Sequence, residues 1–280
     1  MSDDDAYEKQ ILPHKLSIVA KRRPCVDPIR DDGRGTGPCE GSLRPPMVDY
    51  PKYASFGSAY SDMHHMDIKI PGEHTFEGKR YDAEFQIFHT HHTIARINSI
   101  AIPVRGVQGG YNEEFQWILD EFQNVYDQHQ AECEASRRNL RQQQQSQLEP
   151  PSLTNDMAND SRELFNIHLF KFNPYSDSLM PGMWFYRYDG SITEPPCREL
   201  TWWVMDEPAT ISLEQLDQLK RLLFTHVDSN CHPTSVHNSD QMSVRPIQPL
   251  GEDRVIQYCP AGSFKSDIEK GRKPAKRCRA

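Results

Sequence analysis

Three histidines stand within four positions of the chain, His89, His91 and His92, at the end of the segment DAEFQIFHTHH. Histidine is the commonest metal ligand among side chains, and three neutral imidazoles with an open fourth position are typical of catalytic zinc. Bound zinc lowers the pKa of water to about 7 and so produces a hydroxide nucleophile at neutral pH. These residue types suggest a metal site, which requires the three side chains to converge.

The alternation of this segment divides its polar residues between two faces. Apolar and polar side chains alternate, which predicts a β-strand, and successive side chains of a strand point to opposite faces. Glu84, Gln86 and Phe88 therefore share one face. His89 and His91 share the other face, so the histidines do not act as one cluster with the inward polar positions.

The elements that must position these residues are mostly strands. Alternation over 63–70, 79–89 and 96–106 predicts three neighbouring strands of one sheet. Further β-rich or extended runs are 12–23, 165–172, 183–193, 199–208 and 243–250. Strands outnumber helices and do not alternate regularly with them. The sequence therefore predicts a mainly β fold with a few surface helices.

Two segments have the period of an amphipathic helix. In 113–147 apolar residues recur three and four positions apart, until the pattern ends in a glutamine-rich tract. In 212–224 Ser212 is the expected N-cap, and leucines form the stripe that should be buried. The glutamine-rich tract is expected to be solvated.

Composition excludes some classes of partner. The 280 residues carry a formal net charge of −8, which argues against nucleic acid because phosphate binding needs a basic surface. No apolar run approaches the roughly 18 residues of a transmembrane helix, so no membrane span is expected. The length corresponds to one large domain or two small ones.

The number and spacing of the cysteines indicate the cellular compartment in which the chain folds. None forms a CxxC pair, and the seven are Cys25, Cys39, Cys133, Cys197, Cys231, Cys259 and Cys278. So many cysteines favour disulfides, and hence the secretory pathway, the extracellular space or an organelle lumen. The odd number leaves at least one thiol unpaired or paired outside the chain. The first residues lack the features of a signal peptide, so the native chain is expected to begin further upstream.

Three separated motifs resemble those of one enzyme family. They are PGEHTFEGKRYDAEFQIFH at 71–89, YDGSITEPPCRELTWWVMDEPATISLEQL at 188–216 and SVRPIQPL at 243–250. Their order and spacing resemble the α-class carbonic anhydrases over about 60–105 and 165–250. The resemblance implies a large, twisted, mostly antiparallel central sheet of the α-carbonic anhydrase type. It also implies a conical cleft, where active members hold zinc on three histidines and hydrate CO2.

The resemblance also divides the chain. Residues 59–260 correspond to the family's domain, with a helical, glutamine-rich insertion at about 113–160. Residues 1–58 are expected to be an irregular segment and a truncated start of the domain, because they lack the Gln-Ser-Pro-Ile and Asn-Gly-His-Ser stretches of the family. Residues 261–280 are expected to be a basic, disordered tail.

The resemblance implies that the zinc ligands are lost. In the family, two ligands form a His-x-His pair on one strand, and the third lies on the next strand, two positions after a glutamate. With the EHT motif at 73–75 matched, these positions fall on Asp67, Lys69 and Gln86. No His-x-His occurs between residues 50 and 75, whatever the match. No cofactor is therefore expected.

Other positions of the family's site are kept. By the same resemblance, Thr193 matches the threonine that orients the zinc-bound hydroxide, and Glu73 matches its acidic partner. Glu84 and His89 match residues that support the ligands from behind, with His89 buried as a structural residue and not a ligand. The walls of the apolar CO2 pocket are matched by Phe88, Ile192 and Trp203. The ring of Phe88 is larger than the usual aliphatic residue and would partly fill the pocket.

Two arrangements of the replaced ligands are expected. Lys69 either pairs with Asp67, and with the carbonyl oxygen of Gln86, or extends toward water up the cleft. An ion pair in place of the metal predicts a binding or scaffold protein without hydratase activity, resembling the non-catalytic carbonic anhydrase-related proteins. Its partner would be an unknown protein, a glycan or an anion held by Lys69. The alternative is an active carbonate dehydratase with zinc on Asp67, Gln86 and a nearby histidine.

Overall fold

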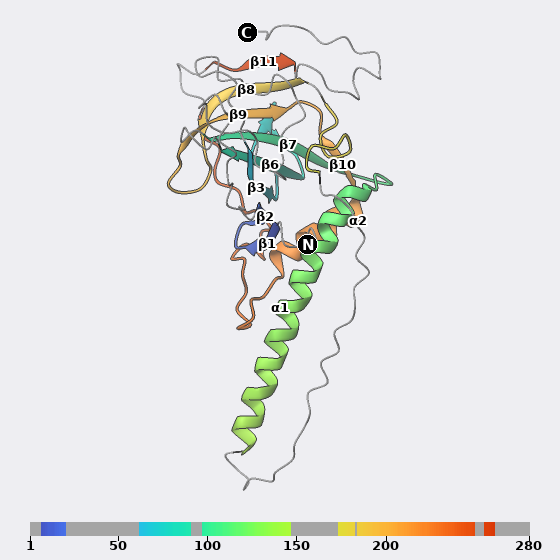
Figure 1. Cartoon of the computed structure of the whole chain (residues 1–280), viewed down its shortest axis with the longest axis vertical. Helices are drawn as coiled ribbons and strands as arrows, with labels where there is room; N and C mark the ends of the chain where they lie inside the picture. Colours follow the sequence, from blue (N-terminus) through green and yellow to red (C-terminus); the bar gives the residue numbers. More distant parts are fainter. Residues whose placement is uncertain are drawn as a thin grey trace, which may run out of the picture.

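The structure is a computed structural model that describes residues 7–20, 62–90, 97–146, 173–182, 184–249 and 255–260. Figure 1 shows a body built around one sheet, with a single long helix that extends away from it. Several predictions fall outside the described residues: those for Cys25, Cys39, His91 and His92, for the strand at 165–172, for the end of the insertion after 146, and for the tail at 261–280.

The described residues form eleven strands and two helices. The strands are β1 (Tyr7–Leu12), β2 (Lys15–Ala20), β3 (Asp62–Lys69), β4 (Thr75–Phe76), β5 (Lys79–Arg80), β6 (Ala83–Thr90), β7 (Ile97–Val107), β8 (Trp184–Ser191), β9 (Glu199–Met205), β10 (Ala209–Ser212) and β11 (Gln257–Pro260). The helices are α1 (Glu113–Ser146) and α2 (Leu213–Phe224).

Nine strands build one sheet in the order β1-β2-β3-β6-β7-β9-β8-β11, with β10 beside β7. The strands β4 and β5 form a separate two-stranded sheet. In the large sheet the pairs β7–β9 and β7–β10 are parallel, and the other pairs are antiparallel. The predicted mainly β fold with a large, mostly antiparallel central sheet is therefore confirmed.

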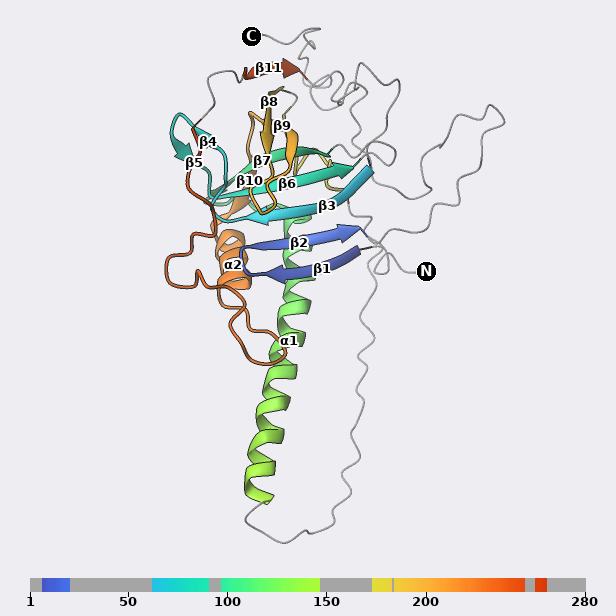
Figure 2. The same ribbon diagram turned by 90° about the vertical axis from the view of Figure 1, so that its left-hand side faces the viewer.

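The N-terminal part of the chain differs from the prediction. Residues 1–58 are expected to be irregular, with a single run at 12–23, but β1 and β2 form an antiparallel hairpin at the edge of the sheet. Figure 2 shows this hairpin beside β3. Proline 13 ends the first strand because it lacks an N–H for the ladder, and β2 then pairs with β3. Pairing with a strand far along the chain is invisible to local alternation.

The two helices start together and pack on one face of the sheet. The Asn112 side chain accepts a hydrogen bond from the N–H of Phe115 and so caps α1, while Ser212 caps α2 as predicted. The Gln215 side chain joins the two starts, because it accepts from the Asn112 N–H at 3.0 Å and donates to the Asn112 carbonyl at 2.7 Å. The apolar face of α1 then enters the main core beside Phe85.

The distal half of α1 leaves the body. Among the α1 side chains whose burial is described, up to residue 142, the last buried one is Cys133, which forms a disulfide with Cys231 in the loop after α2, and residues 134–142 are exposed. Figure 1 shows this part of the helix projecting beyond the sheet. The disulfide therefore fixes α1 at the point where packing ends. Cys197, at the turn between β8 and β9, is free and exposed.

The disulfide is compatible with the secretory or extracellular location expected from the cysteines. Over the residues that the structure describes, neither helix is long and apolar enough to cross a membrane.

We expect the disulfide to stabilise the chain substantially. It joins residues 98 positions apart, and a disulfide typically stabilises a protein by about 2–4 kcal/mol by restricting the unfolded chain, with more stabilisation for longer loops. The double substitution Cys133→Ala with Cys231→Ala should lower the free energy of urea unfolding by that amount. The exposed free thiol provides the control: Cys197→Ser should leave the unfolding midpoint unchanged, and equal midpoints for all variants would contradict the expectation.

Candidate functional site

The register between β3 and β6 brings the three predicted ligand positions together. Asp67 lies opposite Gln86, and Lys69 lies opposite Glu84. Side chains that stand directly opposite in an antiparallel pair have Cβ atoms about 5 Å apart, so these four side chains share one face. All four are almost completely buried. The placement of the positions follows the prediction, but their contacts differ from it.

Lys69 pairs with a residue that sequence reasoning did not single out. Its ammonium donates to a carboxylate oxygen of Glu194, in the turn between β8 and β9, and its side chain is only 1% exposed. No direct ion pair with Asp67 exists in the described part of the chain, so the predicted Lys69–Asp67 contact is wrong. The alternative, in which Lys69 extends toward water, is also wrong, because the head group is buried.

The cation that pairs with Asp67 is Lys15, on the N-terminal hairpin. The ammonium of Lys15 is 2.8 Å from one Asp67 oxygen, and the Ser17 hydroxyl donates to the other at 2.7 Å. The Lys15 ammonium also donates to Glu194 at 2.9 Å. The result is a chain of alternating charges, Asp67–Lys15–Glu194–Lys69, which we call the ion-pair network. Two cations and two anions make it electrically neutral, as burial requires.

Two of the four members had a weak sequence signal. Lys15 and Ser17 alternate on the same face of β2, and Ser17 pairs directly with Asp67, but this requires knowing that β2 lies next to β3. Glu194 directly follows Thr193, which was singled out, but no local pattern distinguishes it in the turn that contains Pro195 and Pro196. Its role depends on the turn folding back over β2 and β3.

The electrostatics keep both acids ionised. Burial by itself would raise the pKa of the Asp67 carboxyl, but the hydrogen bond from His65 and the charges of His65 and Lys15 outweigh it and hold the pKa below its usual value. Burial opposes ionisation of Glu194 in the same way, and the close approach of the His14 ring nitrogen, 3.1 Å away, together with the charge of Lys69 holds that pKa well below its usual range. Both carboxyl groups of the network are therefore ionised at neutral pH.

Gln86 faces two carboxylates, not the lysine. Its amide nitrogen donates to Glu73 at 2.8 Å and to Glu84 at 2.9 Å. The Thr193 hydroxyl donates to the same Glu73 oxygen at 2.6 Å, so the predicted Thr193–Glu73 pair is present. The carbonyl oxygen of Gln86 is buried and has no hydrogen-bond partner among the described residues, so the expected contact with Lys69 is wrong as well.

Glu84 supports a second chain of polar groups. It accepts from the backbone N–H of His74 at 2.9 Å and lies 2.7 Å from Nδ1 of the same residue. The other ring nitrogen of His74 is 2.7 Å from the Tyr188 hydroxyl. Burial would raise the pKa of the Glu84 carboxyl, but the charge and hydrogen bond of His74 outweigh it and lower the pKa.

The residues predicted for an apolar pocket do not all share a face. Phe88 stacks on His65 and belongs to a small apolar cluster with Trp202, against which Ile192 packs. Trp203 points to the opposite face and packs in the main core against Phe185. The prediction for Trp203 is therefore wrong, because strand alternation places the neighbouring Trp202 beside Phe88.

His89 lies on the face predicted for it, away from Gln86. Its side chain is fully buried, and its Nε2 is 2.7 Å from the Tyr175 hydroxyl. Burial lowers the pKa of His89 to about 3, so the ring stays neutral in the native chain. Its environment is that of a structural core residue.

The donor set does not fit zinc. An ammonium has no lone pair to offer a metal, and Lys69 stands at one of the three ligand positions. Asp67 is already occupied by Lys15 and Ser17, which leaves the carbonyl oxygen of Gln86 as the one unoccupied donor atom among the three predicted ligand positions within the described structure. Across the described ranges no group of three or more His, Cys, Asp or Glu side chains is arranged to hold a metal ion.

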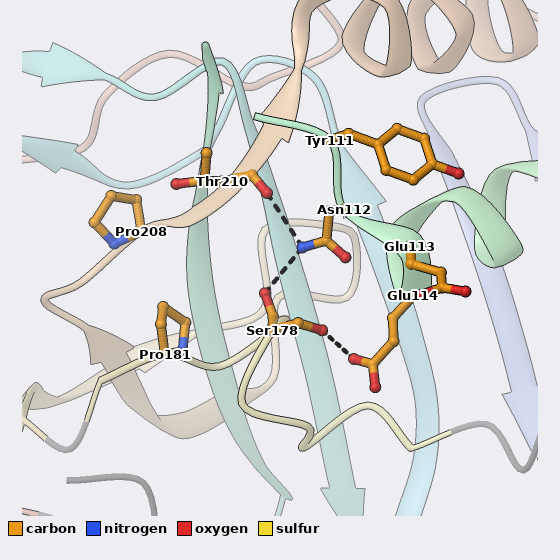
Figure 3. A pocket seen from close by; sticks show the side chains of 8 residues that line it. All are labelled: Tyr111, Asn112, Glu113, Glu114, Ser178, Pro181, Pro208 and Thr210. Atoms are coloured by element: carbon orange, nitrogen blue, oxygen red, sulfur yellow. Dashed lines mark hydrogen bonds between the residues drawn. The ribbon is translucent and has the colours of Figure 1, made fainter. Parts of the chain in front are cut away.

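A separate pocket of about 420 Å³ lies at the start of α1. Figure 3 shows Asn112 reaching across it to the carbonyl oxygens of Ser178 and Thr210, with hydrogen bonds of 3.0 and 3.1 Å. Glu114 and the Ser178 hydroxyl form a further hydrogen bond on its wall. None of the residues that line this pocket belongs to the ion-pair network, so it is not the predicted site.

Comparisons with known proteins agree on one family. Residues 61–259 match the family model of the eukaryotic-type carbonic anhydrase. "Putative carbonic anhydrase 5" of Caenorhabditis elegans is 42% identical over 78 residues, which are 28% of this chain and 22% of that protein. Human "Carbonic anhydrase-related protein" is 40% identical over 93 residues, 31% of this chain and 30% of that protein. These alignments span less than a third of either relative.

Comparison with solved structures also finds proteins of this family. An α-carbonic anhydrase from Thermovibrio ammonificans, in complex with the inhibitor sulfanilamide, aligns with 90% of this chain and 74% of its own, at 19% identity and a TM-score of 0.46.

The ion-pair network should respond strongly to the loss of one partner. Asp67→Asn leaves the Lys15 and Lys69 charges with a single anion, and breaking a buried pair typically lowers the free energy of unfolding by about 3–5 kcal/mol. Lys15→Met with Asp67→Leu removes both charges and should be less destabilising than Asp67→Asn alone. A control is the more exposed Lys9–Glu121 pair, where Glu121→Gln should lower the free energy of unfolding less than Asp67→Asn does. Equal effects at both pairs in urea unfolding would contradict this.

His89 should make the chain sensitive to acid. Its folded pKa of about 3 lies below the ordinary 6.5, so between these values the unfolded chain binds a proton that the native chain does not. The free energy of unfolding should therefore fall as the pH drops from 6.5 toward 3, by up to about 1.4 kcal/mol per pH unit from this residue. In urea unfolding between pH 7 and pH 5, His89→Gln should flatten that slope. The exposed His232 serves as the control, and an unchanged slope in His89→Gln would refute the assignment.

Proposed function

Because the chain belongs to the eukaryotic-type carbonic anhydrase family, as the match over residues 61–259 shows, we propose that it is a member without zinc-dependent hydratase activity, which acts as a binding or scaffold module. One observation carries the proposal. The Lys69 ammonium, bonded to Glu194, stands at one of the three ligand positions, and Lys15 and Ser17 occupy the carboxylate at another.

The remaining parts of the site are built around this network. A zinc ion would bring two positive charges to this face, and the two ammonium groups bring the same charge in a different place. Thr193 and Glu73 still form their hydrogen bond, and the same Glu73 oxygen accepts a second one from the Gln86 amide nitrogen. Without a metal, the Thr193 hydroxyl has no bound hydroxide to orient. The pair therefore supports a structural role here.

The relatives carry both kinds of name, carbonic anhydrase and carbonic anhydrase-related protein, so the proposal rests on the residues of this chain. The alternative, an active carbonate dehydratase, would need zinc on Asp67, Gln86 and a nearby histidine. His65 is near enough to be considered, with Nε2 3.5 Å from an Asp67 oxygen. That set would require Lys15 to leave Asp67 and would place zinc close to the Lys69 ammonium.

The test is a paired measurement on the purified chain. We expect zinc well below one equivalent after incubation with excess zinc and removal of the unbound ion, and CO2 hydration by stopped flow at the rate of buffer alone. The triple substitution Asp67→His, Lys69→His and Gln86→His should gain zinc binding, because it restores three imidazoles on one face. The matched control replaces the same three residues with alanine, and it should not bind zinc.

Stoichiometric zinc in the unmodified chain, together with zinc-dependent hydration of CO2, would overturn the proposal and establish the alternative. The phenyl ring of Phe88 should keep hydration slow even in the histidine variant, since it fills space in the apolar cluster beside His65. Zinc content is therefore the primary readout for that variant.

A further inference from the structure

Three basic side chains converge on the carboxylate of Glu194. The Lys15 ammonium donates to Oε2 at 2.9 Å, the His14 ring nitrogen lies 3.1 Å from Oε1, and the Lys69 ammonium donates to Oε1. These groups come from β2, from the turn before it and from β3, whereas Glu194 comes from the turn between β8 and β9. The turn between β8 and β9 thus places an anion among three basic side chains, His14, Lys15 and Lys69, which we call the cradle.

Glu194 is the member of the ion-pair network whose side chain can be displaced. Its side chain is 27% exposed, compared with 1% for both Asp67 and Lys69. Its carboxylate contacts only the three basic side chains within the described structure. The backbone of its turn is held separately, by the N–H of Cys197 donating to the Glu194 carbonyl at 2.8 Å. Rotation of the side chain would withdraw the carboxylate and leave the sheet intact.

If the Glu194 side chain rotated out of the cradle, the remaining charges would favour the binding of an anion with a single negative charge. Without Glu194 the network holds two ammonium groups and one carboxylate, which is a net charge of +1 in a buried place. Lys69 would have no partner left in the part of the chain that is described, and an unpaired buried ammonium is strongly unfavourable. The two ammonium groups donate to different oxygens of the Glu194 carboxylate. Their arrangement therefore favours an anion that has two adjacent oxygen acceptors.

We propose that this cradle binds an exogenous carboxylate in place of the Glu194 carboxylate, which acts as a displaceable internal ligand. The inference rests on the metal-free site proposed above, because zinc on Asp67 would displace Lys15 from the cradle. Lys69 and Lys15 hold the incoming carboxylate, and Glu194 competes with it. The site therefore binds its ligand more weakly in the native chain than in a chain without the Glu194 carboxylate.

The test uses acetate as the probe and the full chain as the protein. A tethered competitor has an effective concentration in the millimolar range, so Glu194→Ala should bind acetate at least about tenfold more tightly than the native chain. Binding is followed by titration of 13C-labelled acetate in NMR. Thermal unfolding in sodium acetate, compared with sodium chloride at equal ionic strength, provides the second readout. Acetate should raise the unfolding midpoint of Glu194→Ala more than chloride does.

Three variants make the test specific. Glu194→Gln removes the charge but keeps the side chain in the cradle, so it should gain less acetate affinity than Glu194→Ala. Adding Lys69→Met to Glu194→Ala should abolish acetate binding and the acetate-specific rise in the midpoint. Glu199→Ala, at an exposed glutamate five positions along the chain, should behave like the native chain. If Glu194→Ala folds and responds equally to acetate and chloride, the proposal is overturned.

The source of the carboxylate is settled by a second probe. A short peptide with one glutamate, acetylated and amidated at its ends, presents a protein side chain in place of a free ion. If this peptide binds Glu194→Ala more tightly than acetate does, the ligand is a partner protein's carboxylate, and the reverse order assigns a small free anion. Both orders support the site. Zinc content measured on the same samples separates the two proposals: zinc-free protein without acetate binding refutes only this inference.

Discussion

The buried ammonium of Lys69 is the constraint around which the site is organised. A charge that is 1% exposed needs an anion at contact distance, and Glu194 supplies it. Glu194 in turn must approach β3, which draws the turn between β8 and β9 over the face of the sheet. Lys15 then satisfies the second oxygen of Glu194 and the carboxylate of Asp67. Each partner is needed by the next, so the four charges behave as one unit.

This unit ties the N-terminal hairpin to the rest of the fold. The strands β1 and β2 form one edge of the sheet, and Lys15 and Ser17 of β2 bind Asp67 on the neighbouring β3. Ladder hydrogen bonds alone would place the hairpin, but the side-chain contacts also set its register against β3. The site therefore combines residues of the N-terminal hairpin with residues of β3 and of the turn between β8 and β9.

The central strand β6 contacts the main core with one face and the ion-pair network with the other. Phe85, Ile87 and His89 point toward the main core and the helices, and Glu84, Gln86 and Phe88 point toward the ion-pair network. The contacts on the two faces of β6 are therefore made by different side chains. Such separation allows the metal ligands of a family to be replaced while the core that supports them is retained.

The mainly β class, the two helices and the division of β6 into two faces were predictable from the sequence, because period, capping and alternation are local properties. The grouping of Asp67, Lys69 and Gln86 followed only from the resemblance to a family. The pairing of the charges became visible only in the folded chain. Lys15 and Glu194 lie 52 and 127 residues from Asp67 along the chain, and no local pattern records that contact. The same holds for the placement of Trp202, and not Trp203, beside Phe88, because the face of a strand depends on its pairing across the sheet.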